Sequence, residues 1–538
     1  MDPGRNRRTK EIANGRPASA GATLARKRRT ATRLKCGVAF LFPLIVLGCT
    51  SEPSQRPASR SELIIGNPEG LVEGTDLGIR QTAAALSLES LTQLGPDGRP
   101  VPRLAESWWW TNDGKRLNVN VRRGVTFHDG TSLTAPLAAK ILTEAISRSS
   151  NRALFISLSD VTGVRAENDR QIVFELSRPS ALLPDDLELP LAFGSPQVGT
   201  GPYRITKSDQ SELVLDRFDK YYLGVPQIPR VVIRSFDTVR TAWTSLLRGD
   251  VDMVTNVPPD AVEFISNDDV RVVSFERRYQ YLVAFNSGRA PLNSPVVRRA
   301  LNMAVDREAL IRKVFQGRAQ ASTGPLWPKN WAYNRSIPSY RFDPGLARSL
   351  LQSAGLKADT KSAKPDTRFR FTCLIPENFN VNERVALEVQ KQLYDVGVEM
   401  QFEVVPSKDF DTRVRQGRFE AVLIAMISGP SVGRSYLFWR SAGRANGLNV
   451  FGYENEQAER LFDVFRSSTN DVAVQSAFSR LQQVFLDDPP ALFLAWDERS
   501  RAIRRQFEVE QTMGGPVDPV YTIWRWKPAV GPQLAVAR

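Results

Sequence analysis

Residues 112–135 read NDGKRLNVNVRRGVTFHDGTSLTA and show a pattern that recurs along the chain. Residues 116–122 alternate apolar and polar side chains, which predicts a half-exposed strand. Asp129 and Gly130 then predict a tight turn, because glycine adopts a positive φ without strain. A helix is expected after the turn, with Thr134 as its N-cap.

Strand and helix patterns alternate in the same way over the rest of the chain. Predicted strands cover residues 62–67, 116–122, 171–176, 212–217, 231–235, 281–286, 369–375, 399–405, 421–427 and 491–496. Predicted helices cover residues 81–94, 134–147, 238–247, 296–314, 344–354, 382–396, 455–467 and 473–486. This alternation predicts an α/β fold built from two lobes.

Eight stretches, in order, closely resemble the family-5 bacterial extracellular solute-binding proteins, which are the oligopeptide- and dipeptide-binding subunits of ABC importers. They are LESLTQLGPDGRPVPRLAESW (88–108), the stretch 112–135, GTGPYRI (199–205), LLRGDVDM (246–253), YLVAFN (281–286), VRRALNMAVDREALIRKVFQG (297–317), GPLWPKNWAYN (324–334) and FDPGLARSLLQSAGL (342–356). The glycines of GTGPY are expected to allow a sharp chain reversal. Asp306 and Arg307 are expected to lie in a helix, where a nearby ion pair would explain them first.

The resemblance implies a periplasmic-binding-protein clamshell of type II with an extra subdomain inserted in lobe I. Lobe I would comprise residues 61–283 and 497–538, with the insertion at about 95–195, and lobe II residues 284–496. Solute would bind between the lobes, and closure would bury it. The closed form, expected to be a monomer, would dock on a membrane permease with its ATPase, without a cofactor and without breaking a bond.

The start of the chain resembles a bacterial lipoprotein signal. Residues 36–53 read CGVAFLFPLIVLGCTSEP, behind a basic leader. The apolar run is too short to span a bilayer, and residues 46–49 resemble a lipobox that ends at Cys49. We therefore expect a signal peptide over residues 1–48, lipidation of Cys49 and a polar tether over residues 49–60. A buried apolar helix that happens to contain a cysteine is the alternative.

This leader accounts for most of the net charge. The chain carries +14, and +9 of that lies in residues 1–48, so +5 remains for the exported part. A basic total of this origin is a poor argument for a nucleic-acid partner. Once Cys36 is cleaved and Cys49 is lipidated, only Cys373 is left, and we expect it to be a buried, inert thiol.

The residues needed for catalysis are sparse. His128 is the single histidine, so a catalytic triad or a metal site made of several histidines has no second member. Its place beside a tight turn favours a scaffold role with local hydrogen bonds, and a ligand or general base is the alternative. No phosphate-binding glycine loop is present. An export signal without these residues predicts a binding protein, with no metal and no catalytic residue.

The solute is harder to infer. In peptide-binding members, an aspartate after an apolar lobe II strand receives the peptide ammonium, within a Trp-x-x-Asp motif. Here Met426 stands in place of the tryptophan and Gly429 in place of the aspartate. A buried ammonium without a counter-charge would cost several kcal/mol. A peptide with a free N-terminus is therefore doubtful unless Glu69 substitutes, and Glu69 is equally well a solvated loop acid.

Nine residues are our candidates for solute contact: Asn67, Glu69, Gly70, Asn286, Trp327, Met426, Ile427, Ser428 and Gly429. Among the lobe II aromatic residues, Trp327, Trp331, Tyr333 and Trp439 are expected in loops or at loop edges. Trp327 and Trp331 belong to a family stretch, so packing explains them first, and stacking on a solute is the alternative.

Four functions stay open. The first is a lipid-anchored receptor for a peptide or peptide-like solute, and the second a receptor for a non-peptide solute such as a sugar conjugate or an opine-like molecule. The third is an envelope protein that kept the fold without transport. The fourth, an exported hydrolase, needs a nucleophile–base pair that the sequence does not offer.

Overall fold

The computed structural model describes residues 62–68, 77–358, 367–377, 380–429, 431–441, 448–510 and 518–529. The predicted signal peptide, Cys49, the tether, Glu69 and Gly70 lie outside the described residues.

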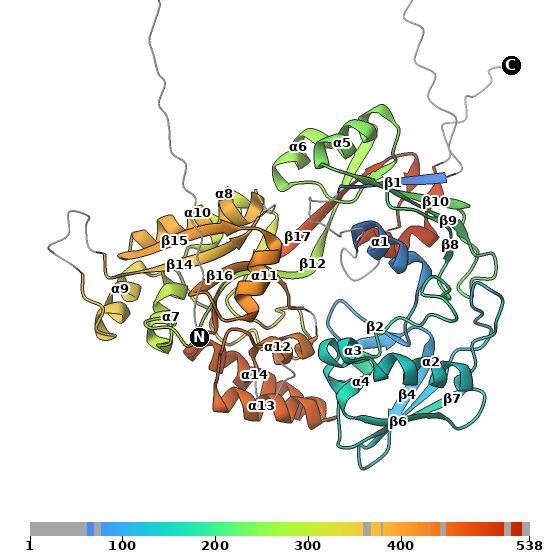
Figure 1. The fold of residues 1–538 in the computed structure, drawn as a ribbon, viewed down its shortest axis with the longest axis horizontal. Coiled ribbons are helices and arrows are strands. Elements are labelled where there is room, and N and C mark those ends of the chain that lie inside the picture. The colour runs from blue at the N-terminus through green and yellow to red at the C-terminus, as the bar shows by residue number, and fades with distance from the viewer. Residues whose placement is uncertain are drawn as a thin grey trace, which may run out of the picture. The chain divides into compact units, whose positions relative to one another are not determined.

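One mixed sheet of eleven strands organises most of these residues (Figure 1). Its order is β15 (Val398–Val405), β14 (Phe369–Pro376), β16 (Ala421–Ile427), β12 (Val270–Phe285), β17 (Ala491–Arg504), β11 (Met253–Val254), β1 (Glu62–Pro68), β10 (Arg230–Phe236), β9 (Glu212–Arg217) and β8 (Tyr203–Ser208), while β13 (Ala319–Ala321) pairs with β17. Parallel and antiparallel pairs both occur, which agrees with the predicted α/β class.

Two long neighbouring strands, β12 and β17, join the two halves of this sheet. Arg271 to Glu276 pair with Glu498 to Ile503, and β17 continues onto β11 there. Beyond a register shift between Glu276 and Gln280, β12 pairs with both β17 and β16. We call the strands β13–β16 with their helices the β16 half, and β1 with β8–β11 the β1 half.

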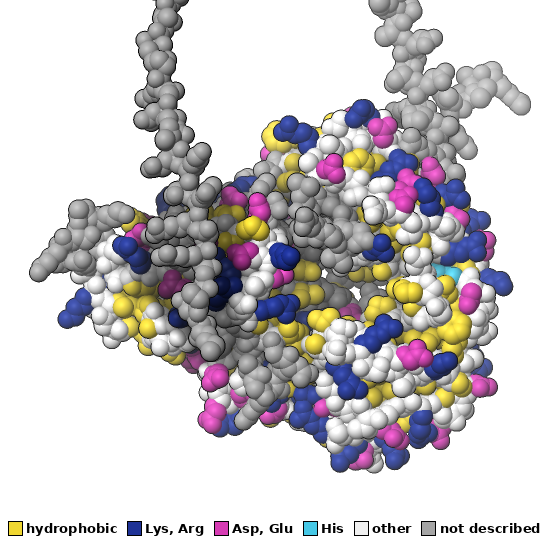
Figure 2. All heavy atoms as spheres, viewed as in Figure 1, with side chains coloured by type: hydrophobic (Ala, Val, Ile, Leu, Met, Phe, Trp, Pro, Cys, Tyr) yellow, Lys and Arg dark blue, Asp and Glu magenta, His cyan; other side chains and the backbone are white. Residues whose placement is uncertain are grey.

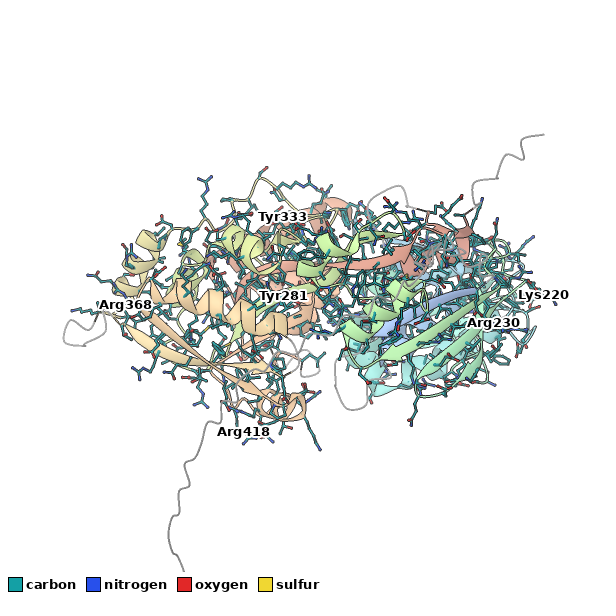
Figure 3. All side chains as sticks on the ribbon, turned by 90° about the horizontal axis from the view of Figure 1, so that it is seen from above. Lys220, Arg230, Tyr281, Tyr333, Arg368 and Arg418 are labelled. Atoms are coloured by element: carbon teal, nitrogen blue, oxygen red, sulfur yellow. The ribbon has the colours of Figure 1, made fainter. Side chains whose placement is uncertain are left out.

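Each half has its own helices and core. The β1 half is covered by α1 (Leu77–Ser87), η2 (Pro259–Ala261), α5 (Val239–Arg248), α6 (Val262–Ile265) and η3 (Pro519–Arg525), with the small pair β18 (Phe507–Glu508) and β19 (Lys527–Pro528). The β16 half carries α7 (Pro295–Met303), α8 (Arg307–Val314), α9 (Pro344–Ser353), α10 (Asn380–Tyr394), α11 (Ser407–Arg415), α12 (Val432–Trp439), α13 (Glu456–Ser467) and α14 (Asp471–Asp487). In Figure 3, Tyr281 of β12 lies between Arg368 and Lys220, which are toward opposite ends of the view.

A separate four-stranded sheet, order β4-β5-β7-β6, forms what we call the four-stranded unit. Its elements are β2 (Thr92–Leu94), β3 (Pro100–Pro102), β4 (Ala105–Trp110), β5 (Arg116–Val121), α2 (Ala135–Ser147), α3 (Ser149–Leu154), η1 (Ile156–Ser159), β6 (Val161–Ala166), β7 (Gln171–Leu176) and α4 (Leu183–Asp186). Its apolar side chains form one core cluster that runs from Leu91 to Leu191. The inserted subdomain expected at about 95–195 falls on this unit.

Local signals set several boundaries correctly. The Thr134 side chain accepts from the backbone N–H of Leu137 and caps α2 as predicted. Helix α5 begins at a Thr238 capping box and ends at Gly249, whose φ is 79°. Gly130 has φ 91°, so the predicted tight turn is confirmed.

Other predictions are wrong. The single helix expected over 296–314 is broken between α7 and α8, because Asp306 turns its side chain to the N–H of Ala309 and caps a new helix. Asp306 is therefore the cap of α8 and not a residue within one continuous helix. The Arg307 guanidinium is buried and donates to main-chain carbonyls, including those of Ser322 and Phe493. Burial lowers its pKa to about 10.

Two further boundaries differ. The helix predicted over 81–94 ends at Ser87, and the strand predicted over 281–286 is the last part of β12, which begins at Val270. The chain bends through residues 200–202, which agrees with the expected reversal, and Gly199 and Gly201 also allow close packing there. A Cβ on Gly199 would lie 2.1 Å from the Ser87 carbonyl oxygen, and one on Gly201 2.7 Å from that of Leu86.

Candidate functional site

The end of β16 lies beside β12. Four of the residues predicted to contact the solute, 426–429, lie at or just after this strand end. Met426 pairs with Gln280 and Ile427 with Tyr279 in the antiparallel register. The Ser428 hydroxyl donates to the carbonyl of Met426 at 3.3 Å. Met426 and Ser428 are buried and Ile427 is half-buried, so these residues offer little free polar surface at the strand end.

Gly429 is packed directly against Trp327. A Cβ on Gly429 would lie 2.9 Å from Cε3 of the indole, closer than real Cβ atoms approach. The ring is held in place by Trp496, which it meets edge-on at a centroid distance of 4.8 Å. Any side chain at position 429 must therefore displace Trp327, and the interpretation of this tryptophan as a packing residue has a geometric basis.

The loop that carries Trp327 also touches the four-stranded unit. The indole Nε1 donates to the carbonyl of Pro96 at 3.4 Å, and the N–H of Trp331 donates to that of Asp97 at 2.9 Å. The Arg99 guanidinium lies 3.7 Å from the centroid of the Trp331 ring. The family stretch around these tryptophans thus forms part of the contact between the four-stranded unit and the β16 half.

The other two predicted aromatic residues are packing residues. Trp439, expected at a loop edge, is the last residue of α12 and is fully buried, with its ring stacked 5.4 Å from that of Phe451. Tyr333 meets Phe478 edge-on at 6.2 Å. Trp439 thus stands at a helix end, as expected, and its apolar helical neighbours place its ring inside the core.

On the β1 half, Asn67 lies near the end of β1 and is buried. Its side-chain carbonyl accepts a hydrogen bond of 2.6 Å from the Thr255 hydroxyl. The Asn286 side chain, after β12, donates to the carbonyls of Gly417 and Phe419 and accepts from the N–H of Gly288. The amide of Asn286 is therefore engaged in holding main chain around β16.

Helix α4, which lies near α12 (Figure 1), carries two carboxylates that sequence reasoning missed. The Ser431 hydroxyl donates to Asp185 at 2.9 Å, and the N–H of Ser157 donates to Asp186 at 2.7 Å. Burial raises the pKa of Asp186 to about 6. Burial and the neighbouring Asp186 raise the pKa of Asp185 well above its usual range. The available signal was an acidic pair inside the apolar stretch LLPDDLELPL, residues 182–191.

Both ring nitrogens of His128 form hydrogen-bond contacts with the main chain of the GTGPY segment. Its Nε2 lies 3.0 Å from the carbonyl oxygen of Gly201, and its Nδ1 accepts from the N–H of Gly199 at 3.3 Å. Burial lowers its pKa. Cys373 is likewise buried, within the core of the β16 half, and burial raises the pKa of its thiol. The local contacts of His128 agree with the predicted scaffold role.

Within the described ranges, no group of three or more His, Cys, Asp or Glu residues is placed to hold a metal ion. In the same residues, no helix has the length and apolar character needed to cross a membrane. Basic and acidic side chains are intermixed on the face shown in Figure 2.

Known proteins resemble this chain over most of its length. The oligopeptide-binding protein AppA of Bacillus subtilis is 24% identical over 79% of this chain and 82% of its own. The glutathione-binding protein GsiB of Pectobacterium atrosepticum is 25% identical over 78% and 84%. The crystal structure of NikA from Brucella suis in complex with Fe(III)-EDTA superposes with a TM-score of 0.75 at 18% identity, over 87% of this chain and all of NikA.

The structural likeness confirms the α/β, two-lobed clamshell of the type II periplasmic binding proteins. Residues 99–447, well over half of the chain, match the profile of the bacterial extracellular solute-binding proteins, family 5, middle region. The chain belongs to the bacterial extracellular solute-binding proteins of family 5.

Proposed function

We propose that this chain is the exported, lipid-anchored solute receptor of an ABC importer. It captures a peptide or peptide-like solute between two lobes and delivers it to a membrane permease. Family membership and relatives named for oligopeptide and glutathione binding support this proposal. The sequence around Cys49 supports the anchor.

The strands β12 and β17 carry the proposed motion. The β1 half with the four-stranded unit would be lobe I with its inserted subdomain, and the β16 half would be lobe II. Both long strands cross from one half to the other, and β12 changes register between Glu276 and Gln280. A register shift locally bends a paired strand, so we place the hinge here, a few residues before the lobe boundary expected at 283/284.

The chemistry at Gly429 carries the proposal about the solute. With Trp327 against Gly429, none of the described residues 421–429 places a carboxylate at the strand end. A solute whose ammonium had to be buried there would lack its counter-charge, at a cost of several kcal/mol. We therefore expect a peptide-like solute without a free amine at this position. The same observation favours the second candidate, a receptor for a non-peptide solute.

Binding without bond cleavage is part of the proposal. The single histidine of the chain has both ring nitrogens engaged with Gly199 and Gly201. It is therefore unavailable as the general base that a serine or cysteine nucleophile would require.

Native mass spectrometry of protein purified from its own host tests the solute. We expect one bound species that does not react with an amine-specific label after release. A ladder of free-amine oligopeptides would contradict the argument from Gly429, and a sugar conjugate would establish the second candidate. The control is the same preparation after unfolding and refolding in solute-free buffer.

Replacing Cys49 by serine tests the anchor separately. We expect Cys49→Ser to abolish lipid modification and release the protein from the membrane fraction, while Cys36→Ser should change neither. Unchanged lipid modification of the Cys49→Ser variant would show that the lipobox assignment is wrong.

A further inference from the structure

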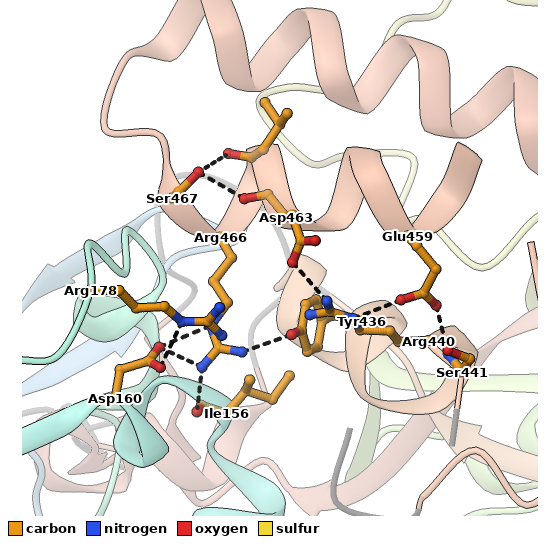
Figure 4. Close-up of polar contacts among 11 residues, drawn as sticks. Ile156, Asp160, Arg178, Tyr436, Arg440, Ser441, Glu459, Asp463, Arg466 and Ser467 are labelled. Atoms are coloured by element: carbon orange, nitrogen blue, oxygen red, sulfur yellow. Dashed lines mark hydrogen bonds and ion pairs between the residues drawn. The ribbon is translucent and has the colours of Figure 1, made fainter. Parts of the chain in front are cut away.

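The four-stranded unit and the β16 half share a buried ion pair (Figure 4). Asp160 follows η1, and Arg466 lies in the last turn of α13. The Arg466 Nε donates to Asp160 Oδ2 at 2.9 Å, and Nη2 contacts the same oxygen. The exposed fractions of the two side chains are 6% for Arg466 and 7% for Asp160. The two residues are 306 positions apart, so this contact joins distant parts of the chain.

Other groups complete the contact on both sides. The Arg466 Nη1 donates to the hydroxyl of Tyr436 on α12 at 2.7 Å, and the Nε of Arg178 donates to Asp160 Oδ1 at 2.9 Å. A main-chain hydrogen bond also joins the two parts, since the N–H of Ala181 donates to the carbonyl of Arg466 at 2.6 Å. The charged groups at this contact are thus almost fully hydrogen-bonded.

Apolar packing accompanies the ion pair. Ile156 and Leu182, both from the four-stranded unit, are buried within the core cluster of the β16 half. Arg434 of α12 donates to the carbonyl of Leu154 at 3.1 Å. The contact therefore combines a charged centre with buried apolar neighbours, as stable interfaces do.

We propose that Asp160, Arg466 and the Ala181–Arg466 main-chain bond hold the closed arrangement of the two lobes, and that they separate when the lobes open. This inference rests on the lobe closure of the proposed function. The buried side chains leave no room for a solute group, so they act as positioning residues. They would raise the closed population both with and without solute.

The expected effect on the closed-to-open ratio follows from the change in solvation of Asp160 and Arg466 when the lobes open. In the closed arrangement their desolvation is offset by the ion pair and its hydrogen bonds, and opening returns both ions to water. Hydrogen bonds to charged groups contribute on the order of 1.5–3 kcal/mol, which corresponds to at least about tenfold in the closed-to-open ratio.

A second ion pair supplies the matched control. Arg440 follows the last residue of α12, and Glu459 lies in α13. Their side chains are about as buried as those of Asp160 and Arg466, and Arg440 Nε lies 2.9 Å from Glu459 Oε2. This pair lies wholly within the β16 half. The Arg440 and Arg466 guanidiniums both lie over the Tyr436 ring, at 4.6 and 5.5 Å from its centroid. The two pairs thus have similar surroundings, and only one crosses between the lobes.

Hydrogen exchange on the full chain, without added solute, tests the proposal. In Arg466→Met, we expect the Ala181 amide to exchange about tenfold faster or more. The Leu183 amide, which donates within the four-stranded unit to Ser180, should keep its rate. In Arg440→Met, helices α12 and α13 should lose protection while the Ala181 amide stays close to the parent rate.

Equal acceleration of the Ala181 amide in both variants, or none in Arg466→Met, would overturn the inference. Tyr436→Phe is the fallback if Arg466→Met does not fold. It removes one hydrogen bond to Arg466, and a smaller acceleration of the Ala181 amide alone is expected; no acceleration would again overturn the inference. Because no solute is added, a failure of the proposed transport function would leave this result unchanged.

Discussion

The end of β16 and helix α4 meet near the same boundary, but their chemistry is opposite. At the strand end, Gly429 is neutral and in contact with the Trp327 ring. On α4, Asp185 and Asp186 are two carboxylates with raised pKa values, and Ser431 connects the two regions by its hydrogen bond to Asp185. The carboxyl groups at this boundary therefore come from the four-stranded unit and not from the strand end.

The largest effect is expected from adding charge to the neutral region. Gly429→Asp forces the Trp327 ring to move and buries a carboxylate, so the free energy of unfolding should fall by about 3–5 kcal/mol. Denaturant unfolding measures it. Gly429→Ala isolates the steric part and should lower stability by about 1–3 kcal/mol. Equal stability of the two variants would mean that the new carboxylate has found a partner, against our description of the site.

Removing a carboxylate from helix α4 should increase the free energy of unfolding, where adding one at position 429 decreases it. With a folded-state pKa of about 6, Asp186 favours the native state below its unfolded pKa, and that contribution is lost as the pH rises through 6. Asp186→Asn should therefore raise stability at pH 7 by about 1–3 kcal/mol and flatten its decline between pH 4 and pH 6. Denaturant unfolding at pH 4, 6 and 7 checks this. A less stable Asn variant at pH 7 would contradict the raised pKa.

The next largest change in stability is expected from removing the hydrogen bond between Ser431 and Asp185. Ser431→Ala leaves Asp185 without its donor and removes the cap that receives the N–H of Gly433, so stability should fall by about 1–2 kcal/mol. The thermal midpoint measures the loss. Ser431→Thr keeps a hydroxyl and should recover most of it. If the alanine and threonine variants melt together, the hydroxyl has no such role.

The smallest change in stability is expected at the exposed contact of Arg99 with Trp331 and Asp471. Arg99 lies over Trp331 and pairs with Asp471 at 2.8 Å, but about half of each charged side chain is exposed. Arg99→Ala should lower stability by no more than about 1 kcal/mol, and by less at high salt. A loss as large as that of Ser431→Ala would show that the rim matters as much as the buried boundary.

Local signals allowed much of the fold to be predicted. The bounds of β16 match the prediction, because its apolar stretch is flanked by polar residues and glycine. The prediction was wrong where two local signals compete. An apolar pattern continues through 296–314, but Asp306 offers the backbone a cap and ends that continuity.

The candidate site was predictable only in part. That position 429 is neutral could be read from the sequence, but its contact with Trp327 depends on how two distant loops pack. The Asp160–Arg466 and Asp185–Ser431 contacts join residues 306 and 246 positions apart. No periodicity or motif links such pairs, and without the fold each appears as an ordinary charged or polar surface residue.

The contact between Gly429 and Trp327 also limits how this receptor can evolve. An acidic residue at position 429 is accommodated only if the residue at 327 becomes smaller, so neither substitution brings the benefit alone. For the solute class proposed above, the route to a receptor for free amines passes through a less stable intermediate. Changes of solute preference that keep Gly429 need no such double step, so descendants of this chain are expected to diversify around a neutral strand end.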